Sequence, residues 1–201
     1  MKNVAQLVAA ALLLLAIPAV GCEEPVACDK CEKNSEFSWN PSDQYATVRL
    51  QRFYGLEDLM EAAYKNKRYE EAKTLIAEYL ALAKIYRCNW NYGNAVHDAH
   101  RILGLILLQG GDVDGAAAAL LEAGQSAGSP QLDTFGPDLD LANELLKRGK
   151  TPEVTAYLND IKRFWEMDNG VVDQWLTGIA AGAAPELNKH RASEHCHDRA
   201  N

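Results

Sequence analysis

The sequence predicts an all-α protein, and three observations support that prediction. Apolar residues between residues 45 and 182 recur at helical spacing and almost nowhere alternate. Glycine and proline punctuate these stretches where helices usually begin or end. Neighbouring stretches also carry apolar residues at similar offsets, which indicates paired helices. We therefore expect a right-handed array of about three antiparallel helix hairpins, closed by a capping helix.

The expected helices have recognisable ends. Asn66-Lys67-Arg68 is typical of a turn, Gly110-Gly111 of a helix C-terminus, and Asp112 of an N-cap. Pro152 indicates a further helix start, because the first turn of a helix does not use the N–H that proline lacks. The pattern predicts seven helices, at about 43–65, 69–86, 94–109, 112–123, 138–148, 151–166 and 170–181. In the first of them we expect these residues to face inward: Val48, Phe53, Leu56, Leu59, Met60 and Ala63.

The second hairpin carries a recognisable repeat pattern. A large and a small residue, Leu103-Gly104, stand twelve positions before the small residue Ala116, and the apolar Leu120 follows four positions later. Gly104 and Ala116 have little side chain, so two helix axes can approach to about 8–10 Å. These offsets resemble the tetratricopeptide repeat, and the resemblance implies a degenerate α-solenoid. The other two hairpins match less closely, at Leu59, Ala63, Ala72, Ile76 and Tyr79, and at Leu141-Ala142, Leu145, Val154, Leu158 and Ile161.

The segment from Asn94 to Trp165 also resembles a group of uncharacterised bacterial tetratricopeptide-like proteins. The shared pieces are His97, Leu103-Gly104, Leu120-Leu121-Glu122-Ala123-Gly124, Gly128-Ser129-Pro130-Gln131-Leu132, Phe135-Gly136-Pro137, Leu141-Ala142, Glu144-Leu145-Leu146 and Phe164-Trp165. The resemblance implies a helical repeat and no particular activity. We interpret the region around Leu132 and Phe135 as a fixed turn between repeats with both side chains in the core; a functional loop is the alternative.

Composition restricts the class of protein. The 201 residues carry a net charge of −8, which disfavours a surface that follows nucleic-acid phosphates. With 48% hydrophobic and 24% charged residues, the chain should fold as an ordinary domain. Nucleic acid is therefore not an expected partner.

The first residues predict a secretory leader. Lys2 precedes an apolar run from Leu7 to Ile17 that is too short to span a bilayer, and small residues then lead to Cys22. This pattern resembles the leader of a bacterial lipoprotein, which implies an acylated Cys22 and a lipid-anchored, extracytoplasmic protein of the cell envelope. Ala19 and Gly21 also suit ordinary leader cleavage, so a secreted or soluble periplasmic protein stays open.

Both ends of the expected domain differ from it in composition. Residues 22–44 are polar, contain two prolines and lack an apolar period, which favours a flexible tether. At the other end, residues 183–201 combine Pro185 with a charged run and predict a mobile polar tail. The expected organisation is thus a signal peptide at 1–21, a tether, a helical domain at 45–182 and a tail.

The cysteines allow two interpretations. If Cys22 is acylated, an even number remains in an oxidising compartment, which favours disulfides in one of three pairings among Cys28, Cys31, Cys88 and Cys196. The alternative is a metal or redox site built from both ends of the chain, using Cys28, Cys31, His195, Cys196 and His197. The metal alternative would need a copper or zinc ion, but we favour the disulfides and therefore expect no cofactor.

Catalytic signatures are scarce. His97 and His100 lie one helical turn apart, but a zinc site needs further ligands and the metalloprotease spacing is absent. We therefore interpret His97-Asp98-Ala99-His100 as a helix start with polar caps and a hydrogen bond between a histidine and Asp98. An enzyme stays a minor alternative.

The expected array predicts a binding groove on its first helices. We expect a membrane-anchored scaffold that binds a protein or peptide, without catalysis. The candidate groove residues are Tyr54, Glu57, Glu61, Tyr64, Asp98, Arg101, Leu105, Asn143 and Lys147.

Overall fold

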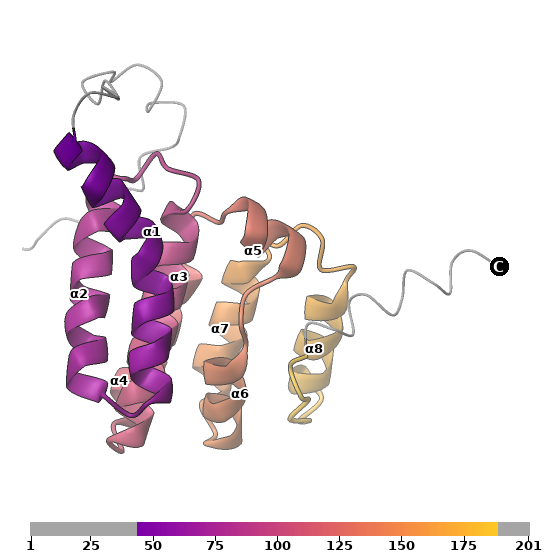
Figure 1. Cartoon of the computed structure of the whole chain (residues 1–201). Coiled ribbons are helices and arrows are strands. Elements are labelled where there is room, and N and C mark those ends of the chain that lie inside the picture. Colours follow the sequence, from indigo (N-terminus) through magenta and orange to yellow (C-terminus); the bar gives the residue numbers. More distant parts are fainter. Residues whose placement is uncertain (1–43, 189–201) are drawn as a thin grey trace, which may run out of the picture.

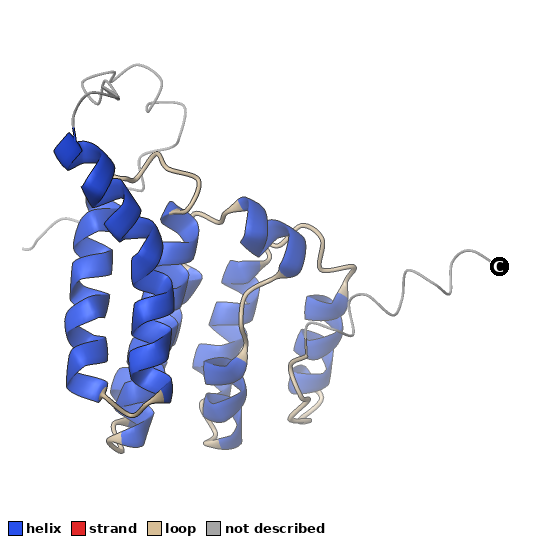
Figure 2. Cartoon of the chain, viewed as in Figure 1, coloured by secondary structure: helices blue, strands red, loops and turns tan. Residues whose placement is uncertain are grey.

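The protein is described by a computed structural model, which defines residues 44–188. In these residues the chain forms eight helices and no strand, so the all-α prediction is confirmed (Figure 2). The helices are α1 (Gln44–Lys65), α2 (Tyr69–Ile85), α3 (Tyr92–Gln109), α4 (Val113–Gly124), α5 (Pro130–Phe135), α6 (Asp140–Lys147), α7 (Thr151–Ile161) and α8 (Val171–Ala180).

The long helices pack in sequential antiparallel pairs. Helix α1 packs on α2, α3 on α4, and α6 on α7, and α8 then packs on α7 (Figure 1). Neighbouring pairs also touch, through α2 and α3 and through α4 and α7. Each pair therefore shields the apolar face of the next one, and α8 covers the last pair.

The contact between α3 and α4 depends on a glycine. A Cβ atom at Gly104 would lie 3.3 Å from the carbonyl oxygen of Ala116 and 2.4 Å from Cδ2 of Leu141. The close crossing expected at Gly104 and Ala116 is therefore confirmed. The turn that follows is also as predicted, because Gly111 has φ +83° and Asp112 accepts a hydrogen bond from the Gly115 N–H at 2.8 Å.

The eighth helix, α5, corrects the expected count of seven. Ser129 caps it by accepting the Leu132 N–H at 3.0 Å, Pro130 occupies its first turn, and Gly136 ends it with φ +72°. Leu132 is buried as predicted, but Phe135 is 69% exposed, so its placement in the core was wrong. Leu132 faces the core, whereas Phe135 is the last residue of the helix, directly before the turn at Gly136.

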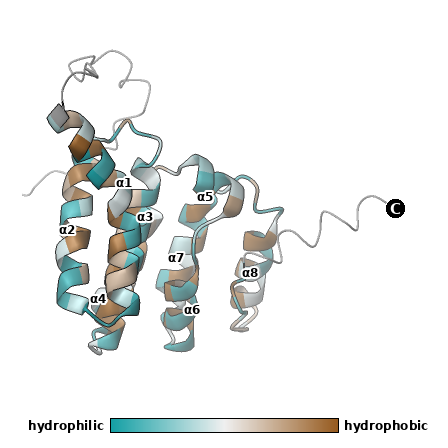
Figure 3. Cartoon of the chain, in the orientation of Figure 1, coloured by the Kyte–Doolittle hydropathy of each residue, from teal (hydrophilic) through white to brown (hydrophobic). Residues whose placement is uncertain are grey.

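The core falls into two clusters that meet at α3. One joins α1, α2 and α3 around Phe53 and Tyr79, and the other joins α4, α6, α7 and α8 around Leu141 and Tyr157. Hydrophobic and hydrophilic residues alternate in bands along the helices, as expected for one buried face each (Figure 3). In α1, four of the six residues expected inside are buried, whereas Val48 and Leu59 are exposed.

The C-terminal part departs from the expected boundaries. Helix α7 ends at Ile161 rather than near residue 166, because the next residues turn and bring Phe164 and Trp165 into the core. Leu187 lies in the segment assigned to the tail, yet it is buried, and its backbone exchanges two hydrogen bonds with the Asn143 side chain at 2.8 and 2.9 Å.

Candidate functional site

A pocket of ≈ 410 Å³ opens between α1, the α2–α3 connection, α3 and α5. Three of the expected groove residues, Tyr54, Glu57 and Asp98, line it. The predicted groove did not include the other lining residues on which the pocket chemistry depends, which are Trp90, Asn94, Gln131, Phe135 and Asp138. Gln131 and Phe135 belong to the segment for which a functional loop was the alternative interpretation. We call it the acidic pocket, because three carboxylates face it and no lysine or arginine does.

Aromatic rings form one rim of the acidic pocket. Tyr54 stacks on Trp90, with ring centroids 5.5 Å apart and planes 20° from parallel. The Tyr54 hydroxyl accepts a hydrogen bond from Asn89 Nδ2 at 2.8 Å, which ties α1 to the α2–α3 connection. Trp90 is 51% exposed, so the pocket offers a fixed aromatic surface to solvent.

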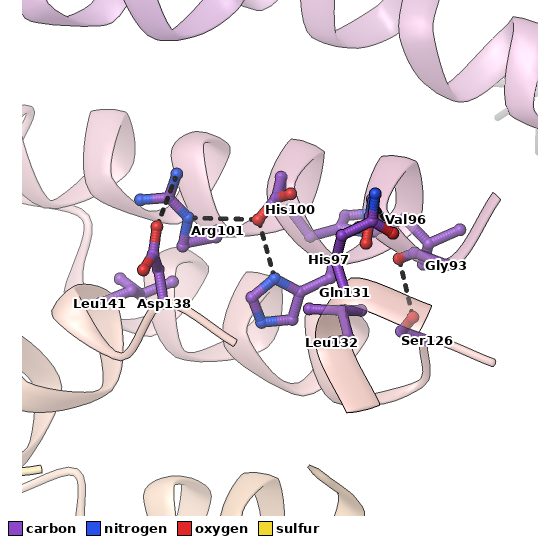
Figure 4. Close-up of polar contacts among 12 residues, drawn as sticks. Gly93, Val96, His97, His100, Arg101, Ser126, Gln131, Leu132, Asp138 and Leu141 are labelled. Atoms are coloured by element: carbon purple, nitrogen blue, oxygen red, sulfur yellow. Dashed lines mark hydrogen bonds and ion pairs between the residues drawn. The ribbon is translucent and has the colours of Figure 1, made fainter. Parts of the chain in front are cut away.

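Amide side chains hold the floor of the acidic pocket. Asn94 on α3 donates to Asn91 Oδ1 at 2.8 Å and lies 3.3 Å from Oε1 of Gln131 on α5. Ser129 also donates to Asn94. Figure 4 shows the neighbouring contact from Ser126 to the Gly93 carbonyl, which is 2.8 Å long. These bonds fix α5 against the start of α3 and so set the width of the pocket.

Arg101 lies behind the pocket among four carboxylates. Its side chain is 7% exposed and its Nη1 donates to Asp140 at 2.7 Å. Asp138, on the segment before α6, lies 3.9 Å from Nη2, and Figure 4 shows it facing Arg101 on α3. Asp98 lies 3.6 Å from Nε, and Glu61 accepts a hydrogen bond from Nη2. The guanidinium thus holds α1, α3 and the start of α6 together.

The charge of Arg101 is stable in this environment. Burial alone would lower its pKa, but the surrounding carboxylates outweigh burial and hold the pKa above its usual value. Its Nε is buried and makes no hydrogen bond within the part of the chain that the structure describes. Arg101 is therefore a permanent cation whose role is to join three helices.

The environment of Glu57 favours its neutral form, whereas that of Arg101 favours the charged form. Glu57 lies half-buried on α1, and burial together with the nearby Asp98, Asp58 and Glu61 raises its pKa to about 7, against a weaker opposing effect of Arg101. The carboxylates around Arg101 have a cation within reach, whereas Glu57 faces the open pocket. Its charge therefore changes near neutral pH.

The expected hydrogen bond between a histidine and Asp98 is confirmed, and the structure identifies the histidine as His97, with 3.0 Å between Nδ1 and Oδ1. The carboxylate can only accept, so Nδ1 donates and Nε2 is left to accept from the Tyr157 hydroxyl at 2.9 Å. Burial raises the pKa of Tyr157 well above its usual value, which keeps the phenol protonated. His97 and Tyr157 are both fully buried, so this chain of bonds serves packing between α3 and α7.

The remaining candidate groove residues lie apart from the acidic pocket. Leu105 is buried in the core, and Tyr64 is half-buried against Tyr69 at a ring distance of 6.2 Å. Asn143 binds the backbone of Leu187, and it lines a second cavity of ≈ 500 Å³ with Lys147 and residues 184–186. The structure therefore does not bring all nine residues into one groove.

Most of the cysteines and histidines that the sequence analysis assigned to lipidation, disulfides or a metal site lie outside the described residues. This applies to Cys22, Cys28, Cys31, His195, Cys196 and His197. Cys88 is disulfide-bonded, but its pairing stays a prediction because every other cysteine lies outside residues 44–188. Between residues 44 and 188, no cluster of three or more His, Cys, Asp or Glu side chains is arranged to hold a metal ion.

The described residues define an all-helical domain built from sequential antiparallel pairs. Searches with this chain find no matching family model, no matching curated protein and no matching solved structure. From Gln44 to Asn188, no helix combines the length and the apolar character needed to cross a membrane. The chemistry of the acidic pocket is therefore the ground on which a function can be proposed.

Proposed function

We propose that this protein is a membrane-anchored, extracytoplasmic scaffold of tetratricopeptide-like type that binds a protein or peptide and performs no catalysis. The observation that carries the proposal is the acidic pocket, which lies where α1 and α3, the first helices of two successive pairs, come together. First helices of successive repeats form the concave binding surface of helical arrays.

The arrangement of pairs supports an array. Helix α1 contacts α3, and α3 contacts α6, so first helices adjoin first helices. Helix α4 contacts α7 in the same way for second helices. The close approach at Gly104 supports the repeat interpretation of the central pair.

The lining of the pocket supports recognition rather than a reaction. The stacked Tyr54 and Trp90 offer rigid aromatic area at low entropic cost, as in many protein interfaces. The one chain of bonds that resembles a catalytic relay, Asp98–His97–Tyr157, is closed to solvent at His97 and Tyr157. A substrate therefore has no access to the imidazole.

Anchoring at Cys22 rests on the leader pattern alone. We expect the intact protein to pellet with membranes and Cys22→Ser to shift it to the soluble fraction. Unchanged pelleting of that variant contradicts the anchor and leaves the binding proposal untouched.

Peptide display against the purified protein tests the binding proposal. We expect the display to enrich a peptide class, and we expect the double variant Tyr54→Ala/Trp90→Ala to lose at least tenfold in affinity for that class, since truncated aromatic anchors often cost 2 kcal/mol or more. The matched control is Tyr45→Ala, which removes an 84% exposed tyrosine from the same helix outside the pocket.

Two results contradict the proposal. One is failure of any peptide class to enrich on folded protein. The other is equal binding by the double variant, with circular dichroism showing that its helices are intact.

A further inference from the structure

We propose that the acidic pocket receives an arginine or lysine side chain of the bound peptide, with the charge facing Glu57, Asp98 and Asp138 and the stem lying on Tyr54 and Trp90. This inference rests on the proposed function and adds the chemical class of the partner.

The charge balance around the pocket favours a cation. Two cationic side chains, Arg101 and Lys65, are paired with carboxylates here. The same region holds the carboxylates of Glu57, Glu61, Asp98 and Asp140, so these four and the two cations leave up to two negative charges in excess. A bound cation would reduce that excess, and a bound anion would increase it.

Among the pocket carboxylates, Glu57 is the one whose ionised form a cationic ligand would stabilise most. No hydrogen bond or ion pair joins its carboxylate to another residue between 44 and 188. It also lines the cavity directly, whereas Arg101 lies behind the lining. The protein thus places a half-buried, uncompensated carboxylate at an open surface, where a ligand can supply the missing charge.

The aromatic rim selects the shape of the cation. A guanidinium is planar and stacks on aromatic faces, and a lysine ammonium is attracted by the same ring quadrupole. The rings of Tyr54 and Trp90 are held by stacking and by the bond from Asn89, so they need little ordering on binding. We therefore expect arginine to bind more tightly than lysine.

The volume of the pocket has room for a basic side chain together with part of the peptide backbone. A cavity of ≈ 410 Å³ lies within the range of small-ligand pockets, which run from about 300 to 1,000 Å³. The exposed Gln131 carries an amide group that can bind the backbone of the flanking residues, whereas both N–H groups of Asn94 are used within the protein. The pocket opens to solvent beside the exposed Phe135, which leaves room for a chain to continue.

Binding should depend on pH through Glu57. With a pKa of about 7, Glu57 is mostly protonated at pH 6 and mostly ionised at pH 8, so affinity for a cation should fall about tenfold from pH 8 to pH 6. Peptide arginine and lysine stay charged throughout this range. The charged or titratable groups near Glu57 are Asp58, Glu61, Tyr79, Asp98, Arg101 and Asp138.

The test is a titration of the purified protein, followed by NMR, with a capped Gly-Ser peptide that contains one central arginine. A second peptide carries citrulline, the neutral isostere, at that position. We expect the arginine peptide to bind at least tenfold more tightly and to shift the signals of Trp90. Glu57→Gln should weaken its binding and abolish the change between pH 6 and pH 8, whereas the control Glu122→Gln, on α4 away from the pocket, should do neither.

Each outcome decides the inference. Equal binding of the two peptides, or unaltered pH dependence in Glu57→Gln, overturns it. Binding of free arginine amide as tight as that of the peptide identifies a small organic cation as the ligand and also overturns it. If peptide display selects a class without basic residues that still needs Tyr54 and Trp90, this inference is wrong while the proposed function stands.

Discussion

The two halves of α3 pack against their neighbours through different kinds of contact, one polar and the other apolar. The half that begins at Tyr92 carries the buried polar residues Asn94, His97 and Arg101. The half from Ile102 to Leu108 is apolar except for Gly104, which lets α4 and α6 approach. The polar half borders the acidic pocket, and the apolar half joins the two core clusters.

This difference shows which contacts can be predicted from the order of residues along the chain. The apolar half needs only size and hydropathy, and both are visible in the order of residues. Each polar residue also needs a specific partner from another helix, and these partners lie far along the chain: Gln131 is 37 residues from Asn94, Asp140 is 39 from Arg101, and Tyr157 is 60 from His97. Three variants sharpen this contrast.

Arg101→Met should be the most destabilising change. It removes the cation that joins α1, α3 and the start of α6, and it leaves Asp98, which is 14% exposed, near other carboxylates without a counter-charge. Loss of one partner of a buried ion pair costs about 3–5 kcal/mol. Because two of the carboxylates here are about half exposed, we expect about 3 kcal/mol from urea unfolding at pH 8.

The loss should be smaller at pH 5, because Glu57, with a pKa of about 7, is then protonated and no longer attracted by the charge of Arg101. Arg52→Met is the control, since its ion pair with Glu78 is about 40% exposed on both sides and should contribute less than about 1 kcal/mol. Similar losses for the two variants would show that the cluster around Arg101 behaves as a surface network.

Gly104→Ala tests the apolar half of α3. Its new methyl group would meet the fully buried Leu141 at 2.4 Å, so either Leu141 or the helix pair must shift. We expect a net loss of about 1–2 kcal/mol, although alanine favours a helix by nearly 1 kcal/mol over glycine. Gly55→Ala on α1 has no atom within 4 Å of the new methyl group and should stabilise the protein. A gain in both variants contradicts the close approach.

The same contrast explains what the sequence could reveal. The long helices and the crossing at Gly104 follow from periodicity and residue size, which are local properties. Helix α5 had a readable start signal, Ser129 followed by Pro130, but its short length made a turn the simpler interpretation. Trp90 and Asp138 carried no such signal, because they enter the acidic pocket from connections whose paths depend on how the pairs pack.

The candidate groove residues show most clearly what helical spacing cannot predict. Tyr54, Glu57 and Asp98 line the acidic pocket because the first helices of two pairs do adjoin. Arg101 and Leu105 lie one and two turns further along α3, where helices of the neighbouring pairs pack against α3 and bury both. Helical spacing identifies which residues share a face, but the depth of cover at each turn is a property of the whole stack.

Tyr157→Phe should give the smallest effect and isolate one polar contact of α3. The variant keeps the ring in the core and removes the hydroxyl that donates to His97 Nε2 at 2.9 Å, which leaves a buried acceptor without a donor. An unsatisfied buried group costs about 1–3 kcal/mol, and we expect about 1 kcal/mol in urea unfolding at pH 8, because the phenyl ring retains the packing. Tyr69→Phe, in a half-buried tyrosine on α2, should stay within about 0.5 kcal/mol of the parent. If Tyr157→Phe matches that control, the polar half of α3 is held by Arg101 and the amide contacts, and His97 acts there only through its shape.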